Sequence, residues 1–272
     1  GKYILSNKKM LTDHEPHNML SLLDVFAYSS NIGTAKIINN FNNIEYYESC
    51  KNFGFGIKTG LPFKSESNGK IRSVADWSRT SKDYISIGQE VSATSMQITL
   101  AYCAIANGGY LVKPHIIKEI NNNNNIIYKR DIIPLRHIIS NNTANTILTA
   151  MERVVSYGTA KNIGLAGYKI GGKTGTAQKF IDNSYSSDEF ISSFVSIYPT
   201  NNPKYVIYIS IDSPDYGYHW ANESAVPTTK EIIKRIIIID DSLDKEHLDF
   251  LANTAINRKE IDNNYIHKKI DH

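Results

Sequence analysis

The stretch "GYKIGGKTGTAQKF", residues 167–180, has the aromatic and aliphatic flanks of a β-strand but places Gly171, Gly172 and Gly175 between them. Glycine is uncommon inside strands because it loses more entropy on folding and offers no side chain for packing. A glycine within a strand indicates that another group approaches the backbone closely. We therefore predict a strand that is approached at the point where it carries Lys173 and two threonines.

Alternation along such a strand puts Lys173 and Gly175 on one face and Thr174 and Thr176 on the other. A glycine-bordered edge strand can accept an extended peptide by strand addition. The lysine supplies positive charge, and a threonine hydroxyl can hold a carboxylate. These residues describe a site for an extended peptide with a C-terminal carboxylate. The alternative is a glycine-rich turn with a solvated lysine, and the stretch alone does not decide between the two.

Two further strands are predicted downstream, "EFISSFVSIYP" at 189–199 and "KYVIYISID" at 204–212, each bounded by proline or asparagine turns. Their short connection predicts antiparallel neighbours. A helix is predicted over 224–239, with Pro227 tolerated in its first turn. Helices dominate the earlier part of the chain and strands this later part. The pattern predicts an α+β fold in which helices pack on an antiparallel sheet.

Apolar side chains at steps of three and four residues predict five helices before these strands. The two strongest begin at the N-caps Thr94 and Ser140 and end at Gly108 and Gly158. Residues 57–90 are rich in turn-forming residues and are predicted to be rich in loops. The other helices are predicted at 18–27, at 34–41 and from 44 to a stop at Gly54. The first of them places its apolar residues at Met19, Leu22, Leu23 and Phe26.

Two strands are predicted around the asparagine run, at 109–120 and 125–132, and they are expected to form a hairpin at the edge of a sheet.

Composition limits the class of protein. The 272 residues are 41% hydrophobic and 21% charged, which is enough for a sizeable core. A net charge of +3 argues against a dedicated nucleic-acid binder. Cys50 and Cys103 are too few for a disulfide framework and lack metal-type spacing, and Cys103 is predicted to be a buried free thiol. No run of about 18 apolar residues predicts a membrane span.

The loop "YSSNIG", residues 28–33, places Ser29 and Asn31 two positions apart at a break between two predicted helices. Taken alone, the two residues are best explained as helix caps. Together with Lys173-Thr174-Gly175, however, Ser-x-Asn belongs to the serine acyl-transferase signature of penicillin-binding proteins and class A β-lactamases. From about residue 10 to residue 238, the chain resembles the transpeptidase domain of class B penicillin-binding proteins, especially the cell-division (septal) type.

The resemblance is collinear over most of the chain. It is carried by "DHEPHNMLSLLDVFAYSSNIGTAKI", "FGFGIKTGLPFKSESNGK", "GQEVSATSMQITLAYCAIANGGYLVKPHI", "GKTGTAQK", "FVSIYPTNNPKYVIYISIDSP" and "WANESAVPTTKEI". It implies the fold of penicillin-binding proteins and β-lactamases, an antiparallel sheet packed between helices with a helical subdomain. The chain departs from the family in detail, with "ATSMQ" in place of Thr-Pro and "WANESA" in place of a Gly-Gly pair. The expected domain covers residues 1–239, and residues 240–272 form a charged tail.

The resemblance also implies residue roles in peptidoglycan cross-linking. A serine attacks the D-Ala-D-Ala bond of a donor stem peptide, and an amine of a neighbouring stem peptide resolves the acyl-enzyme. Ser29 relays a proton, Asn31 holds the substrate amide and the general-base lysine, and Lys173 keeps the site electropositive. Thr174 and Thr176 bind the terminal carboxylate region, beside Gly175, and the Thr176 N–H is an oxyanion-hole donor. β-Lactams acylate the same serine, and the mechanism implies no metal or cofactor.

The nucleophile motif Ser-x-x-Lys is expected upstream of Ser29 in this family. Two strings match, Ser6-x-x-Lys9 and Ser67-x-x-Lys70. The mechanism needs both side chains on one helical turn, whereas the first string is expected in a strand and turn and the second in a loop. The expectation is that the chain is a fragment, with the nucleophile, its lysine and the first strands of the sheet further upstream.

The implied partners are peptidoglycan stem peptides, β-lactams, a membrane glycosyltransferase and other division proteins, at the extracytoplasmic face of a bacterial membrane through an upstream anchor. Two alternatives remain open: a non-catalytic sensor or division scaffold, and a D,D-carboxypeptidase or β-lactamase of the same fold. The chain shows no deacylating glutamate loop, which disfavours a β-lactamase. His219-Trp220, near Tyr216 and Tyr218, is either an aromatic substrate wall or a packed loop. Asp13-His14-Glu15 lacks partners for a metal site.

Overall fold

A three-stranded antiparallel sheet forms the centre of the molecule. The structure is a computed structural model that describes residues 1–240 except 124, 183 and 216. Strands β7 (Gly171–Ile181), β8 (Ser184–Tyr198) and β9 (Tyr205–Asp212) pair in that order, each antiparallel to its neighbour. The predicted meander is confirmed, and the opening stretch is a strand rather than a turn. Within the described residues, β7 is an edge strand of this sheet.

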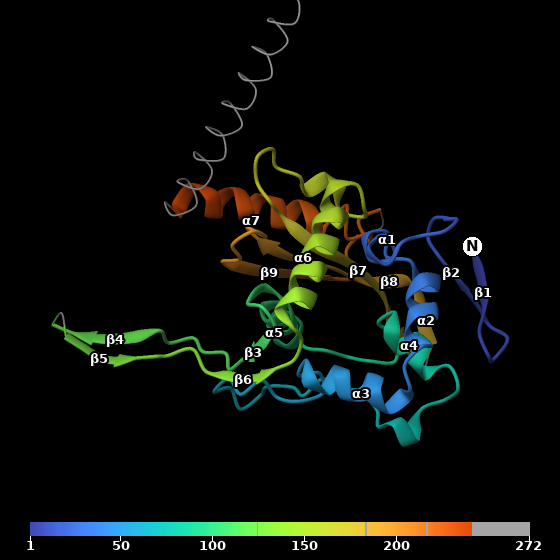
Figure 1. The fold of residues 1–272 in the computed structure, drawn as a ribbon, viewed down its shortest axis with the longest axis horizontal. Coiled ribbons are helices and arrows are strands. Elements are labelled where there is room, and N and C mark those ends of the chain that lie inside the picture. The colour runs from blue at the N-terminus through green and yellow to red at the C-terminus, as the bar shows by residue number, and fades with distance from the viewer. Residues whose placement is uncertain (124, 183, 216, 241–272) are drawn as a thin grey trace, which may run out of the picture.

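Helices cover both faces of the sheet (Figure 1). The isoleucines of β9 alternate with polar residues, so one face of the strand packs against α7 (Ala225–Ile239) through Ile233 and Ile236. On the other face, Ile197 and Val206 pack with residues of α5 (Ser95–Ala106) and α6 (Asn141–Ser156), among them the fully buried Met151. The expected helix–sheet–helix arrangement is confirmed.

Both long helices begin at the predicted caps. The Thr94 hydroxyl accepts from the backbone N–H of Gln97, and the Gln97 side chain returns the bond to the Thr94 N–H, so that a capping box starts α5. The Ser140 hydroxyl accepts from the Thr143 N–H at the start of α6. Gly108 lies just beyond α5 with φ of 83°, where glycine is favoured.

The N-terminal part is a helical layer made of α1 (Leu22–Ala27), α2 (Asn31–Ile38), α3 (Asn43–Asn52), α4 (Ser81–Ser86) and the 3-10 turn η1 (Val74–Asp76). The segment 57–90 was predicted to be rich in loops, and it also contains α4 and η1, which were not predicted. The apolar face predicted for 18–27 is partly wrong. Met19 precedes the helix and is 97% exposed, and Leu22 is 64% exposed, because Ser21 caps α1 and turns Val25 and Ala27 inward.

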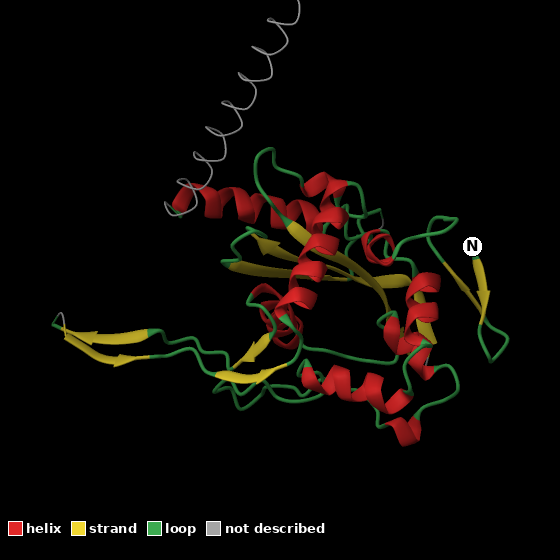
Figure 2. Cartoon of the chain, in the orientation of Figure 1, coloured by secondary structure: helices red, strands yellow, loops and turns green. Residues whose placement is uncertain are grey.

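Three two-stranded sheets complete the fold in the described residues: β1 (Lys2–Ile4) with β2 (Met10–Thr12), β3 (Tyr110–Val112) with β6 (Pro134–His137), and β4 (Glu119–Asn122) with β5 (Asn125–Lys129). The segment 109–120 was predicted as one strand at a sheet edge. It instead divides into β3 and β4, which belong to separate sheets, and β6 was not predicted. The pair β4–β5 projects from the body of the molecule (Figure 2).

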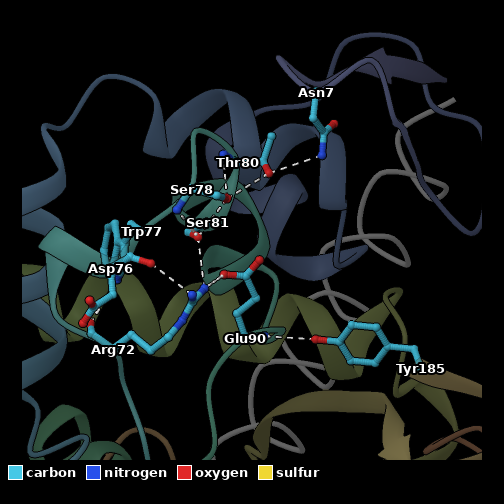
Figure 3. Close-up of polar contacts among 9 residues, drawn as sticks. All are labelled: Asn7, Arg72, Asp76, Trp77, Ser78, Thr80, Ser81, Glu90 and Tyr185. Atoms are coloured by element: carbon cyan, nitrogen blue, oxygen red, sulfur yellow. Dashed lines mark hydrogen bonds and ion pairs between the residues drawn. The ribbon is translucent and has the colours of Figure 1, made fainter. Parts of the chain in front are cut away.

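A polar network joins the helical layer to the sheet (Figure 3). Arg72 forms an ion pair with Glu90 and donates to the Ser81 hydroxyl of α4. The Glu90 N–H donates to the Tyr185 hydroxyl of β8 at 3.2 Å. At the other end of the network, the Asn7 side chain donates to the Thr80 hydroxyl. Segments far apart in the sequence are thus tied together beside β8.

The charged tail expected at 240–272, with Leu248, Leu251, Ala252 and Ala255 proposed as an apolar face, lies outside the described residues apart from Asp240. Among the residues that the structure does describe, no helix is long and apolar enough to cross a membrane. Cys103 is a free thiol but is only partly buried, which corrects the predicted full burial, and its pKa is raised to about 11 because burial penalises the thiolate.

Candidate active site

Ser29 occupies a left-handed turn between α1 and α2. Its φ is 55°, and the backbone around it closes α1 in a Schellman pattern, with Ser29 N–H donating to Phe26 and Ser30 N–H donating to Val25. Glycine usually occupies this left-handed position because it has no Cβ. A serine here keeps a strained backbone and holds its hydroxyl at the junction of the two helices.

The next residue, Ser30, is the N-cap of α2 and also forms a hydrogen bond with Asp13. Its hydroxyl accepts from the Gly33 N–H at 2.9 Å and donates to the Asp13 carboxylate at 2.8 Å. Asp13 also accepts from the Ile32 N–H at 3.0 Å, so its charge lies at the positive end of α2. This role of Asp13 was not predicted from its sequence neighbourhood. This clamp fixes the start of α2 and therefore the position of Ser29.

Lys173 lies in β7 and reaches the Ser29 loop from the sheet. Its Nζ donates to Ser29 Oγ at 2.7 Å and to the Thr174 carbonyl at 2.9 Å, and it lies 5.8 Å from the centre of the Phe26 ring. Burial lowers the pKa of Lys173 to about 8, because the charged form loses solvation. The structure thus brings together two predicted site residues that are 144 positions apart in the sequence.

Thr174 and Thr176 lie on the opposite face of β7 from Lys173, as alternation requires. The Thr174 hydroxyl is 2.6 Å from the Thr159 hydroxyl, which lies just after α6. The Thr176 hydroxyl accepts from the Ala221 N–H at 3.4 Å, in the segment before α7. Neither hydroxyl contacts Ser29 or Lys173 among the described residues. Thr159 was not singled out from sequence, because only tertiary packing brings it to β7.

The glycines of β7 differ in what surrounds them. A Cβ on Gly172 would come within 2.2 Å of the Phe194 ring, and one on Gly171 within 2.8 Å of Thr200 and 3.0 Å of Met151. These two glycines are therefore required by packing inside the protein. A Cβ on Gly175 would meet only Ser193, with its hydroxyl at 2.6 Å, and that side chain can rotate. Of the three glycines, Gly175 alone remains a candidate for approach by a ligand.

Asn31 is the first residue of α2 and points elsewhere. Its side-chain amide donates to the Thr12 carbonyl at 3.1 Å, at the end of β2. This contact joins α2 to the first hairpin, and no hydrogen bond connects Asn31 to Ser29 or Lys173 in the described part of the chain.

A joint between α1 and α6 supports the Ser29 loop from the other side. Asp24 accepts from Arg153 Nη1 at 3.0 Å and from the Tyr157 hydroxyl at 2.6 Å. Hydrogen bonds from Ser21 and Tyr157, with Arg153 nearby, lower the pKa of the Asp24 carboxyl to about 2. At the end of this joint, the Thr159 N–H donates to the Ala27 carbonyl. Sequence reasoning found none of these residues, since their partners are about 130 positions apart.

The two Ser-x-x-Lys strings do not lie on helices. Ser6 is in the turn between β1 and β2, where Lys8 has φ of 65°. Ser67 is in a loop and accepts from the Gly69 N–H, while Lys70 pairs with Ser92 in an isolated bridge. The expectation that they are turn and loop residues is confirmed.

Aromatic rings gather around the segment that precedes α7. The rings of His14 and Trp220 are 4.6 Å apart, and those of Phe190 and His219 are stacked at 5.0 Å. The segment packs, yet Trp220 keeps 42% of its surface exposed. Position 216 lies outside the described residues. The arrangement fits a packed loop with an exposed ring, and its part in substrate binding stays a prediction.

The geometry defines a class of site. A serine hydroxyl held in a strained turn, a desolvated lysine on a sheet edge and a glycine two residues further along that strand form the pattern of penicillin-recognising serine acyl-transferases. The family model described as the penicillin binding protein transpeptidase domain matches residues 1–234. The chain belongs to this family.

Relatives and solved structures agree. The chain is 32% identical to the stage V sporulation protein D of Bacillus subtilis over 220 residues, 80% of this chain and 34% of that protein. It is 30% identical to the peptidoglycan D,D-transpeptidase FtsI homolog of Mesostigma viride, over 86% of this chain and 42% of that protein. The chain therefore spans less than half the length of these two relatives.

Among solved structures, the penicillin-binding protein 3 of Mycobacterium tuberculosis in complex with aztreonam matches with a TM-score of 0.77 and 30% identity, covering 87% of this chain and 55% of that one. The transpeptidase domain of Burkholderia pseudomallei penicillin-binding protein 3 matches with a TM-score of 0.78 and 29% identity, covering 87% and 69%. These matches confirm the fold expected from the sequence.

Proposed function

We propose that this chain is the larger part of the transpeptidase domain of a peptidoglycan D,D-transpeptidase, which cross-links stem peptides through a serine acyl-enzyme during septal cell-wall synthesis. The observation that carries the proposal is the 2.7 Å contact between Lys173 Nζ and Ser29 Oγ, made across the fold by the two signature motifs of the family. Names of relatives support it, since both a D,D-transpeptidase homolog and a sporulation protein are similar over most of this chain.

Each site residue has a proposed role. Lys173 in its charged form attracts the substrate carboxylate. Ser29 relays a proton to or from the leaving amine. Gly175 leaves room for the substrate backbone beside β7, and the Thr176 N–H stabilises the oxyanion. Thr174 and Thr176 take up the carboxylate region, which requires Thr174 to leave the Thr159 hydroxyl. Asn31 is proposed to hold the substrate amide after release from Thr12.

The attacking serine and its lysine are proposed to come from residues outside this chain, because both Ser-x-x-Lys strings within it lie in a turn and a loop. The test is labelling by a fluorescent penicillin. The full-length protein is expected to be acylated and the 272-residue chain is not. Stable covalent labelling of the 272-residue chain would overturn this assignment. No labelling of the full-length protein would favour a non-catalytic scaffold.

The same assay tests Lys173. In the full-length protein, Lys173→Met is expected to slow acylation by about a hundredfold or more, since it removes a charge that acts on the reacting groups. Lys179→Met is the matched control, because Lys179 lies in the same strand but pairs with Glu189 and Asp212. Acylation by the wild type is expected to fall as pH rises through about 8, where Lys173 loses its proton.

The proposal extends to the whole protein. Residues 1–239 are proposed to be the C-terminal part of the transpeptidase domain, and the substrates to be D-Ala-D-Ala donor and amine acceptor stem peptides. Peptidoglycan lies outside the plasma membrane, so the site is proposed to work on that face, held by a membrane anchor outside this chain. A membrane glycosyltransferase and other division proteins are the proposed partners, and β-lactams the proposed inhibitors.

A further inference from the structure

The β4–β5 hairpin is an exposed apolar arm. Its two strands pair only with each other in the described structure, and every described residue of both is exposed. Ile127 is 65% exposed, and Ile132, just beyond β5, is 77% exposed. Soluble proteins rarely leave so many large aliphatic side chains together in solvent unless they bind a partner. The hairpin also exposes Ile120, Ile126 and Tyr128, and the segments that flank it expose Ile116, Ile117, Ile133 and Leu135.

The arm and the segments that flank it also carry an excess of positive charge. Residues 113–137 contain five lysines and arginines and two carboxylates, a net charge of +3 that equals the formal net charge of all 272 residues. Lys118, Lys129 and Arg130 form no ion pair within the described residues. The positive charge of these three side chains is therefore available to an acidic partner.

The two open edges of the arm are not equivalent. A two-stranded sheet leaves one row of N–H and C=O groups unpaired on each strand, which a further strand can pair. Glu119 lies on β4, where it accepts from Asn121. Lys129 ends β5, and Arg130 follows it. Lys118 offsets Glu119 on the β4 side, whereas Lys129 and Arg130 outweigh Asp131 on the β5 side. An acidic segment is therefore attracted more strongly at the β5 edge.

We propose that β5 is a docking edge for an extended segment of a partner protein in which acidic and aliphatic residues alternate. The aliphatic side chains cover the isoleucines of the arm, carboxylates of the segment pair with the charges of Lys129 and Arg130, and the backbone of the segment pairs with the β5 edge. An anionic bilayer could bind the positive charges and the apolar surface, but it cannot form hydrogen bonds with the unpaired backbone groups of β5 as a strand does. A polypeptide therefore accounts for all three features of the arm.

The surface at the base of the arm is also apolar and positively charged. A hollow of about 340 Å³, which includes open solvent, lies between β6, α5 and the end of α3. Leucines line it together with two cations, Lys58 and Arg136. An acidic and aliphatic segment that runs along the arm meets a matching surface at its base.

The test uses the 272-residue chain and a fluorescent nine-residue peptide that alternates glutamate with isoleucine and valine. Fluorescence anisotropy is expected to show binding, and amide exchange is expected to slow at residues 125–130. The double variant Lys129→Glu with Arg130→Glu is expected to bind about tenfold or more weakly. Glu119→Lys on the other strand is the matched control and is expected to bind as tightly as the wild type or more so.

Three further probes decide between explanations. A peptide with lysine in place of glutamate, and a glutamate peptide N-methylated at alternate residues, are both expected not to bind. Equal binding of either one overturns the proposal, and so does binding to phosphatidylglycerol vesicles without binding to the peptide. All substituted side chains are exposed or at the surface, so unchanged melting temperatures of the variants are expected to show that the fold is intact.

Discussion

At the residue scale, the position of Ser29 requires a strained backbone conformation. It has φ of 55° at the left-handed end of α1, where glycine is usual. We expect Ser29→Gly to stabilise the folded chain by about 1 kcal/mol, because glycine adopts this conformation without a Cβ clash. The same change removes the hydroxyl that accepts from Lys173 and is expected to abolish acylation in the full-length protein. Chemical denaturation and penicillin labelling measure the two effects, and a loss of stability would contradict the strain argument.

The lowered pKa of Lys173 predicts how the free energy of unfolding depends on pH. Burial lowers its pKa to about 8, whereas an unfolded lysine keeps its proton up to about pH 10.5. Between these values the unfolded chain binds more protons, so the free energy of unfolding should rise with pH through this window. Lys173→Met removes that rise, and the variant should gain most relative to the wild type below pH 8. Urea denaturation from pH 7 to 10.5 measures the difference, and parallel pH profiles would contradict it.

The glycines of β7 separate packing from ligand approach. Gly172→Ala should cost about 2–3 kcal/mol of unfolding free energy, because its Cβ would overlap the buried Phe194 ring. Gly175→Ala should cost less than about 1 kcal/mol, because Ser193 can rotate away. In the full-length protein, Gly175→Ala should nevertheless slow acylation if the substrate backbone lies there. Equal acylation by wild type and Gly175→Ala would remove Gly175 from the site.

At the scale of elements, the joint between α1 and α6 determines where Ser29 lies. A Cβ on Gly158 would come within 2.4 Å of the Ala27 carbonyl, the atom that accepts from the Thr159 N–H. We expect Gly158→Ala to push α1 from α6, with a loss of about 2 kcal/mol in stability and slower acylation in the full-length protein. Gly164→Ala is the matched control, since its Cβ would meet only the Lys161 carbonyl at 3.6 Å. Equal melting temperatures of the two variants would contradict the role of this joint.

Elements with local signals were predictable, and those defined by distant contacts were not. The caps at Thr94 and Ser140 and the alternation in β8 and β9 lie within a few residues of sequence, so α5, α6 and the sheet followed from pattern. The short α4 has no such signal. The β3–β6 pair has none either, because the β4–β5 arm separates β6 from β3 in the sequence. For the same reason Ser29 and Lys173 were found through their motifs, whereas Asp13, Asp24 and Thr159 were not.

At the scale of the whole molecule, stability is concentrated in the packed sheet and its helices. Phe194 and Val154 are fully buried in one hydrophobic cluster, and Met151 and Ile197 are fully buried in a second. The β4–β5 arm, by contrast, contributes residues that are exposed in every described position. The fold therefore separates a part that must pack from a part that is free to bind.

This separation predicts that the arm can be removed without loss of the fold. The Arg130 N–H donates to the Lys118 carbonyl at 2.8 Å, so residues 119–129 can be replaced by Asn-Gly, which closes a two-residue hairpin on that bond. We expect the free energy of unfolding to change by less than about 1 kcal/mol, because exposed residues bury little apolar surface. Met151→Ala, in the core, should cost about 2–5 kcal/mol in the same urea titration.

The shortened chain should also lose binding of the acidic nine-residue peptide while keeping its far-ultraviolet circular dichroism. In the full-length protein it should leave penicillin acylation unchanged, since neither Ser29 nor Lys173 contacts the arm through a hydrogen bond. A shortened chain that unfolds like Met151→Ala would show that the arm is part of the core. One that folds normally but still binds the peptide would place the docking surface elsewhere.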